Sequence, residues 1–329
     1  MFSRELELRG RAFVNYGALS QVEVKDMTID GFPAKLFFNP ARVRSVMADV
    51  SPEALQKRAC FLCPDGLEPL QLTTVWDSPT GQTYFIRVNP FPIFNHHFTI
   101  SSAIHERQTF APHMESMLHL AQAMPEMSIF YNGPMCGASA PDHMHFQAVP
   151  RHSMPIEDHF DTNYANAVLV QESDLQSHLT ALEKVLSMAS IPENASQTGS
   201  LTAGASRTEE WEPRWNIISW YTPSPNGDSV ESCRMVQNGV ELSDEETTLH
   251  NTTQRYTTLH NGVFNTIIFF RRESRPMCFF APENERILFS PGTVEMGGVG
   301  IVANRESFDR ITPEVLRSMI QEVADTLCI

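Results

Sequence analysis

Two histidines and a glutamine alternate along one short segment, Asp-His-Met-His-Phe-Gln at residues 142–147. In a β-strand every second side chain points to the same face of the sheet, so His143, His145 and Gln147 would line one surface. An imidazole nitrogen can act as a nucleophile or bind a metal ion, and an amide can donate a hydrogen bond to a negatively charged oxygen. The segment therefore predicts one surface that is lined by two imidazoles and an amide.

The loop before this segment, residues 131–141, is rich in groups that suit an anion. Asn132 and Ser139 supply an amide and a hydroxyl, and Gly137 allows the backbone to approach a ligand closely or to take a positive φ. The alternative is a His-x-His pair that is simply buried in a strand and satisfied by its neighbours. The polar groups of the loop, together with Gln147, favour a functional site over that alternative.

A second chemical motif is Cys60-Phe61-Leu62-Cys63, which holds the only two of the six cysteines that are close in sequence. Two thiolates on one tight turn are typical of a structural zinc site, which has four ligands of this kind. Two ordinary buried cysteines are the alternative. A redox pair is disfavoured because no thioredoxin-like βαβ pattern surrounds the motif.

The hydrophobic pattern around these motifs predicts an antiparallel sheet with a helix on one face, an α+β arrangement. Strands are expected at residues 72–76, 83–88, 97–101, 127–131 and 144–149, with a hairpin turn at 78–81 and a helix at 113–123 that ends before Pro125. The first 55 residues are expected to hold one helical stretch at 43–47, with Pro33 and Pro40 in loops.

The second half has the same order of strands followed by a closing helix, although no repeat is visible in residue identity. We expect a strand and an amphipathic helix over 164–190, strands at 215–221, 264–271 and 298–303, and a last helix from Pro313 to about residue 327 with Thr312 as its cap. Small polar side chains dominate residues 192–210, which predicts a mobile loop or linker there.

The bulk composition is that of a folded chain, with 329 residues of which 42% are hydrophobic and 19% charged. This length fits two ordinary domains, and we expect a division into residues 1–160, which carry both motifs, and residues 161–329. A net charge of −15 argues against nucleic-acid binding. Because no apolar run of about 18 residues and no apolar signal core are present, we expect a cytoplasmic protein that does not bind a membrane.

The histidine segment and its loop resemble the transferase branch of the histidine-triad superfamily. That branch includes galactose-1-phosphate uridylyltransferase, diadenosine tetraphosphate phosphorylase and the GDP-hexose phosphorylases, and it shares an Asn, then Gly-x-Ser, then His-x-His-x-Gln. The resemblance implies two histidine-triad-like halves, each an antiparallel sheet with packed helices. It also implies that His145 attacks the α-phosphorus and carries the nucleotidyl group, that Gln147 and Ser139 contact the phosphates, and that Asn132 and Gly137 lie in the substrate site.

The spacing between Ser139 and His143 is one residue longer than the family pattern, and a bulge would accommodate the extra residue. The position of Gln147 separates two branches, because hydrolases of the superfamily usually carry a third histidine there. The glutamine therefore resembles the transferase signature.

A second stretch, residues 89–105, extends the resemblance, since the superfamily has an Asn-Pro followed by two histidines eight residues apart. This implies that Asn89 and His97 belong to the substrate site. By the same resemblance, a structural zinc ion would be held by Cys60, Cys63, His105 and His143.

Two arginines are further candidates for binding phosphate, because guanidinium groups match phosphate oxygens. They are Arg151, which follows the histidine strand, and Arg275, which ends the run Arg-Arg-Glu-Ser-Arg at 271–275. The alternative is that both are ordinary solvated charges at strand ends.

The function that this resemblance implies is a nucleotidyltransferase or phosphorylase without a redox cofactor. Its donor would be a nucleoside diphosphate sugar or a dinucleoside polyphosphate, and its acceptor a sugar phosphate or inorganic phosphate. A nucleotide hydrolase and a non-catalytic nucleotide-binding protein are the alternatives. A homodimer is expected only by analogy with the family.

Overall fold

The computed structural model describes residues 2–66, 71–188, 212–224, 234–237, 240–241 and 262–325. The predicted loop at 192–210 lies outside these residues.

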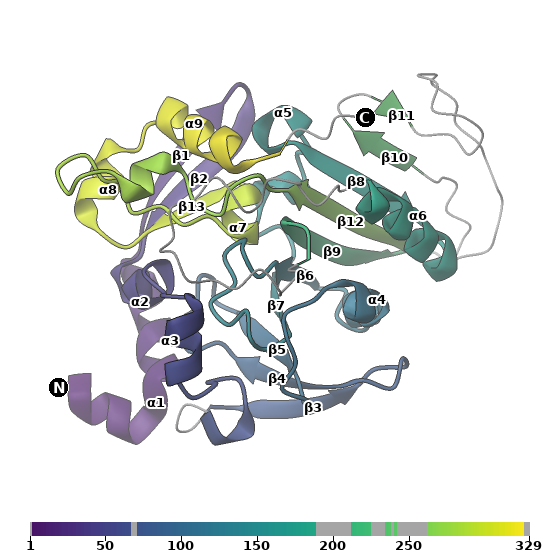
Figure 1. Ribbon diagram of the computed structural model, residues 1–329, viewed down its shortest axis with the longest axis horizontal. Helices are drawn as coiled ribbons and strands as arrows, with labels where there is room; N and C mark the ends of the chain where they lie inside the picture. The colour runs from purple at the N-terminus through teal and green to yellow at the C-terminus, as the bar shows by residue number, and fades with distance from the viewer. Residues whose placement is uncertain are drawn as a thin grey trace.

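A large sheet dominates the described part of the chain (Figure 1). Its ten strands follow the order β11-β10-β8-β12-β9-β6-β7-β5-β4-β3, and every pair is antiparallel. The strands are β3 Thr73–Asp77, β4 Thr83–Val88, β5 Phe98–Ser102, β6 Met127–Asn132, β7 His145–Pro150, β8 Ala167–Glu172, β9 Trp215–Pro223, β10 Arg234–Gln237, β11 Val240–Glu241 and β12 Gly262–Phe270. Strands of the predicted N-terminal and C-terminal halves meet at β6 and β9, so the two halves share one continuous sheet.

A smaller sheet joins the two ends of the chain. Its strands are β1 Glu23–Ile29, β2 Phe32–Phe38 and β13 Val299–Val302, and β13 runs parallel to β2. Figure 1 shows the purple N-terminal hairpin beside the yellow C-terminal elements. Strands from both sides of the predicted division near residue 160 therefore pair with each other in this sheet. The domain boundary itself stays a prediction.

The described helices are short apart from four, which are α1 Phe2–Ala18, α4 Met114–Ala123, α6 Leu175–Ser187 and α9 Pro313–Val323. The others are α2 Val43–Val46, α3 Pro52–Lys57, α5 Thr162–Ala165, α7 Thr293–Met296 and α8 Arg305–Arg310. Side-chain caps begin two of the longer ones: Asp174 accepts a hydrogen bond from Ser177 N at α6, and Thr312 from Val315 N at α9. The predicted cap at Thr312 is thus confirmed.

Two hydrophobic cores cover the two faces of the large sheet. Helices α4 and α6 pack against one face, where Met144, Phe146 and Ala148 of the β7 region are completely buried. The smaller sheet and α9 pack against the other face, where Val149 of β7 is buried. Because side chains alternate along β7, His145 and Gln147 share the face of Val149 and point toward the C-terminal elements.

The predicted α+β class is confirmed, as are the strands and the helix that surround the histidine segment. The N-terminal prediction was wrong in several respects: Pro33 lies in β2 and Pro40 begins a short 3-10 helix, Pro40–Arg42, so neither is in a loop. Helices α1 and α3 were not predicted. Strand β13 pairs with β2 only from Lys35 onward, so the N–H group that Pro33 lacks is not needed on that side. The hairpin of β1 and β2 was not predicted.

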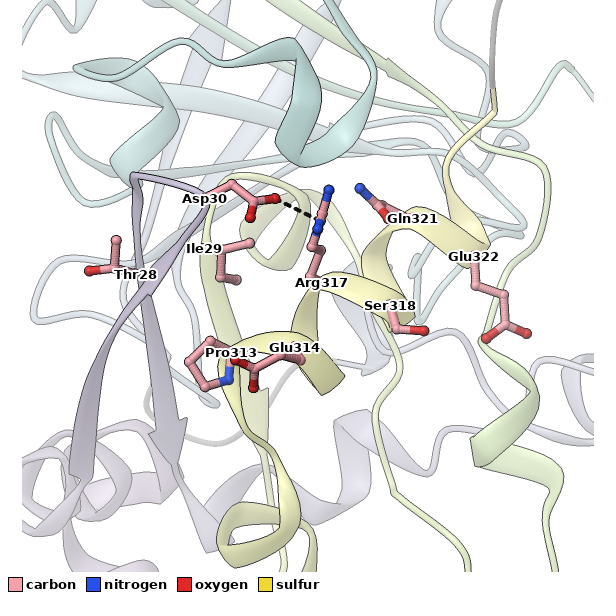
Figure 2. A pocket seen from close by; sticks show the side chains of 9 residues that line it. All are labelled: Thr28, Ile29, Asp30, Pro313, Glu314, Arg317, Ser318, Gln321 and Glu322. Atoms are coloured by element: carbon pink, nitrogen blue, oxygen red, sulfur yellow. Dashed lines mark ion pairs between the residues drawn. The ribbon is translucent and has the colours of Figure 1, made fainter.

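A surface hollow of about 700 Å³ lies between the β1–β2 turn and α9 (Figure 2). An ion pair between Arg317 Nε and Asp30 Oδ2, 2.8 Å apart, crosses it. No predicted site residue lines this hollow. Within the described chain, no helix has the length and apolar character needed to cross a membrane.

Candidate active site

His145 is the first residue of β7, and its ring is held by the backbone that immediately precedes the strand. His145 Nδ1 lies 2.9 Å from the carbonyl oxygen of His143. A carbonyl only accepts, so Nδ1 carries the proton and Nε2 keeps a free lone pair. Burial, with only 4% of the residue exposed, lowers the pKa of His145 to about 4. The ring is therefore neutral at neutral pH and has a nucleophilic Nε2.

Gln147 lies two residues further on the same face, and His97 fixes the orientation of its amide. Ile93 N donates a hydrogen bond to His97 Nδ1 at 3.2 Å, so the proton of this ring is on Nε2. His97 Nε2 then donates to Gln147 Oε1 at 2.8 Å. The amide oxygen of Gln147 is thus occupied, and its NH2 group remains as a donor on the side away from His97.

His97 itself is fully buried, and burial lowers its pKa to about 3. Among the described residues, Asn89 supports the same segment: it donates to Thr99 Oγ1 at 3.0 Å and accepts from Phe91 N at 2.8 Å. The geometry therefore places His97 directly against Gln147, and Asn89 supports the segment that carries His97.

Asn132, the last residue of β6, connects the N-terminal half of the sheet to the C-terminal half. Its Oδ1 accepts hydrogen bonds from Thr293 N and Thr293 Oγ1, both at 2.7 Å, and from Asn216 Nδ2 at 3.0 Å. Arg271 in turn donates to Asn216 Oδ1 at 2.6 Å. Sequence reasoning did not predict this network, because Asn132 lies 84 positions from Asn216 and 161 positions from Thr293.

Gly137 brings the predicted anion loop against the start of α7. Its φ is +94°, and a Cβ built on it would lie 2.7 Å from the Cα of Gly292. Both facts require glycine at this position. Ser139 follows two residues later and is partly exposed. The loop that carries Gly137 and Ser139 therefore faces the segment that Asn132 also binds.

Two charged residues near this site were missed by sequence reasoning. The positive charge of Arg42 contributes, after burial, to lowering the pKa of His97. Burial lowers the pKa of Arg42 to about 10, and Glu295 opposes that shift. Arg42, Glu295 and His97 are thus close enough for their charges to interact, although the chain separates them widely.

The two predicted phosphate-binding arginines each have partners within the protein. Arg151 follows the far end of β7, about 20 Å along the strand from His145, where it pairs with Glu157 at 3.2 Å and stacks on Trp220. Arg275 donates to Ser290 Oγ at 2.9 Å and lies over the ring of Phe279. The structure therefore does not bring Arg151 to His145. Arg275 bonds Ser290, which is two residues before Gly292.

The four predicted metal ligands do come together. The donor atoms of Cys60, Cys63, His105 and His143 all lie within 4.8 Å of one another. His143 Nε2 donates to the carbonyl of Ser102 at 2.9 Å, which leaves Nδ1 unprotonated and facing Cys60 Sγ at 3.2 Å. A backbone partner on the second nitrogen is the usual way in which proteins fix a metal-binding histidine.

The charges around the cluster also suit a cation. Burial is the largest single effect on Cys60 and raises its pKa, but the contact with His143 and the backbone N–H groups of Leu62 and Cys63 together outweigh burial and bring the pKa down to about 6. Burial and the neighbouring Cys60 raise the pKa of Cys63 to about 11. An ion pair between Arg58 and Asp142, 2.5 Å apart, ties the cysteine segment to the histidine segment.

A buried carboxyl group lies beside the strand that carries Asn132. Glu212 accepts hydrogen bonds from the hydroxyl of Tyr131, from Phe110 N at 2.7 Å and from Trp215 Nε1 at 3.2 Å. Burial raises its pKa from 4.5 to about 7. In the unfolded chain this proton is lost near pH 4.5, so between pH 4.5 and 7 the folded state binds more protons.

The stability of the protein should therefore fall as the pH rises through this window, by up to about 3 kcal/mol from Glu212 alone. Glu212→Gln removes the titrating carboxyl group and should therefore make stability depend less on pH in this window. The amide also loses one of the three hydrogen bonds. Urea unfolding at pH 5 and pH 7.5 measures the difference, with the exposed Glu115→Gln as control. An unchanged pH slope in Glu212→Gln would contradict the assignment.

The fold is shared with solved structures of a known enzyme. Crystal structures of yeast Ap4A phosphorylase Apa2 match at 12% sequence identity. The first covers 97% of both chains with a TM-score of 0.55. The AMP complex covers 96% of this chain and 95% of its own, and the Ap4A complex 96% and 97%, each with a TM-score of 0.51. The predicted α+β fold of antiparallel sheets with packed helices is thereby confirmed.

The sequence comparisons are less specific. A family profile described as a domain of unknown function (DUF4922) matches residues 1–150, which include both chemical motifs. No curated protein sequence matches the chain.

Proposed function

We propose that this protein is a nucleotidyl-transferring enzyme that carries a nucleoside monophosphate on His145. The observation that carries the proposal is the fixed tautomer of His145, whose Nδ1 bonds the His143 carbonyl at 2.9 Å and leaves Nε2 as the nucleophile. A dinucleoside polyphosphate is the donor we favour, because the solved neighbour whose fold spans this chain binds Ap4A. A nucleoside diphosphate sugar is the second donor class.

The reaction is a double displacement. His145 Nε2 attacks the α-phosphorus, a P–N bond forms, and the P–O bond to the rest of the donor breaks, with its electron pair leaving on that oxygen. An oxygen of inorganic phosphate or of a sugar phosphate then attacks the same phosphorus, and the P–N electron pair returns to Nε2. The proton stays on Nδ1, hydrogen-bonded to the carbonyl oxygen of His143, throughout both steps, so the ring needs no change of tautomer.

Gln147 would stabilise the charge that develops on the phosphorus oxygens. Its amide oxygen is occupied by His97, and its NH2 group is the donor that remains. Ser139, Gly137 and the segment bound by Asn132 complete the proposed substrate site. A donor group that is fixed before the substrate arrives lowers the cost of reorganisation at the moment of reaction.

We further propose that Cys60, Cys63, His105 and His143 bind zinc. Two sulfur and two nitrogen donors are a common set for structural zinc, and their donor atoms lie within 4.8 Å of one another. Zinc there would hold His143 in place, and the carbonyl of His143 in turn orients His145. Its contribution is structural, since all four positions would be filled by the protein.

The intact mass of the protein after incubation with separate donors tests the function. The donors are diadenosine tetraphosphate, UDP-glucose, GDP-glucose and ADP-glucose, and the sample is kept away from acid because the P–N bond is acid-labile. We expect a gain of one nucleoside monophosphate with one donor class. Transfer of that group to phosphate rather than to water distinguishes a phosphorylase from a hydrolase. Nucleotide binding without a mass gain and without turnover would instead support a non-catalytic binding protein.

A further inference from the structure

A buried glutamine outside the predicted motif interrupts the sheet at His145. Strands β6 and β7 are paired from Met127↔Pro150 to Phe130↔Gln147, and there the pairing stops. Both strands continue on their other sides, β6 with β9 to Asn132 and β7 with β5 to His145. Two more residues of the same register would place Asn132 opposite His145, but that pair is not formed.

The side chain of Gln108 takes the place of the missing pair. Its Nε2 donates to Asn132 O at 2.9 Å and to His145 O at 3.0 Å, and its Oε1 accepts from His145 N at 2.8 Å. Only 1% of Gln108 is exposed. The amide thus acts as an inserted peptide group, with both donor hydrogens and the acceptor engaged.

The backbone of the same segment also holds the loop before the histidine strand. Gln108 N donates to Pro141 O at 3.1 Å, and Met144 N donates to Glu106 O at 2.7 Å. Directly paired strands lie about 4.8 Å apart. Because an inserted amide needs a larger separation, Gln108 holds the ends of β6 and β7 at a fixed distance from each other. His145 stands on one side of this gap and Asn132 on the other.

We propose that Gln108 is a positioning residue for His145, which sets where the nucleophile stands relative to Asn132 and the loop at Gly137. The proposal rests on the proposed function, in which His145 attacks a phosphorus atom. A glutamine is required because glutamate has no donor for the two carbonyls and leucine has neither donor nor acceptor. Gln108 acts through the backbone of His145, so it affects the attack more than the binding of the nucleotide.

Two variants and one matched control test this role. Gln108→Leu removes all three hydrogen bonds, and Gln108→Glu keeps the shape and the acceptor for His145 N if the leucine variant does not fold. The control is Asn265→Ala, because Asn265 is also a buried amide that bonds a backbone carbonyl, that of Val263 at 3.0 Å, but lies on β12. All proteins are compared only where their far-ultraviolet circular dichroism matches that of the wild type.

The first readout is the single-turnover rate of nucleotidyl transfer onto His145, with the donor that gives the mass gain. We expect a loss of about tenfold or more in both Gln108 variants, since small misplacements of a reacting group are costly. The dissociation constant for AMP, measured by calorimetry, should change by less than about threefold. A folded Gln108 variant with a rate near that of the wild type, or with a rate and an affinity that fall together, would overturn the proposal.

The second readout needs no substrate, so it separates this proposal from the proposed function. Diethyl pyrocarbonate modifies unprotonated histidine nitrogens, and peptide mass spectrometry reports the modification of His145 alone. Loss of the Gln108 clamp should speed the modification several-fold, whereas Asn265→Ala should leave it unchanged. Modification of His145 at the wild-type rate in both Gln108 variants would refute the positioning role even if no donor for the enzyme is found.

Discussion

Replacing His145 by asparagine is expected to abolish formation of the nucleotidyl adduct and to reduce steady-state transfer by roughly a thousandfold or more. Asparagine is smaller than histidine but keeps a polar side chain that can bond the His143 carbonyl. It has no basic nitrogen to attack phosphorus, so the covalent route is closed while the strand stays folded. Affinity for AMP should remain, because the proposed contacts to the phosphates come from Gln147 and the loop.

His178→Asn is the matched control for this experiment. His178 is also fully buried, and burial lowers its pKa to about 3, but it lies on α6 and bonds Thr266 Oγ1. Its replacement should cost stability and leave the adduct intact. A His145→Asn protein that retained most of its transfer activity would remove His145 from the mechanism, whatever the control does.

The residues around His145 show what a single sequence can predict. Alternation along a strand predicted that His145 and Gln147 share one face, and the burial of Met144 and Phe146 on the opposite side agrees with it. His143, which was predicted to share that face, instead lies before the start of β7, where its ring contacts Cys60 and the carbonyl of Ser102. Local geometry was therefore sufficient only for the residues inside the strand. The convergence of Cys60, Cys63, His105 and His143 was implied by the family resemblance and could not have come from spacing, since 83 positions separate the first ligand from the last.

The partners of those residues could not be predicted in the same way. Asn132 bonds Thr293, and Gln108 fills the gap between β6 and β7, because the folded chain brings distant segments together. A lone glutamine after a strand has no sequence signature, since its role appears only when the register of two other strands is known. Arg151 illustrates the opposite error: it follows the histidine strand closely in sequence, yet a strand is extended, so it lies far from His145.

The first 55 residues were expected to hold one helical stretch, with Pro33 and Pro40 in loops, and no sheet was predicted there. Their role depends on the other end of the chain, where β13 pairs with β2. The first and last parts of the described chain therefore cover the same face of the large sheet, which is the face toward which His145 points. This could not be predicted from the order of the residues.

Loss of the metal site is expected to have the second large effect. Purified protein that has never met a chelator should contain about one zinc ion per chain. Cys60→Ser and His143→Asn should each lose it, because structural zinc sites rarely tolerate three ligands. Since the free energy of metal binding adds to that of folding, both variants should also unfold at a lower temperature.

Cys278→Ser is the control, because Cys278 is likewise a partly buried free cysteine but lies outside the cluster. Zinc content is measured by plasma mass spectrometry and unfolding by calorimetry, with and without a chelator. The effect on transfer should follow the metal, because His143 supplies the carbonyl that holds Nδ1 of His145. Two results together would contradict the metal site: wild-type protein that contains only traces of zinc, and equal unfolding temperatures for Cys60→Ser and Cys278→Ser. The four side chains would then form a hydrogen-bonded cluster without a metal. In that case only the sheet and Gln108 would orient His145.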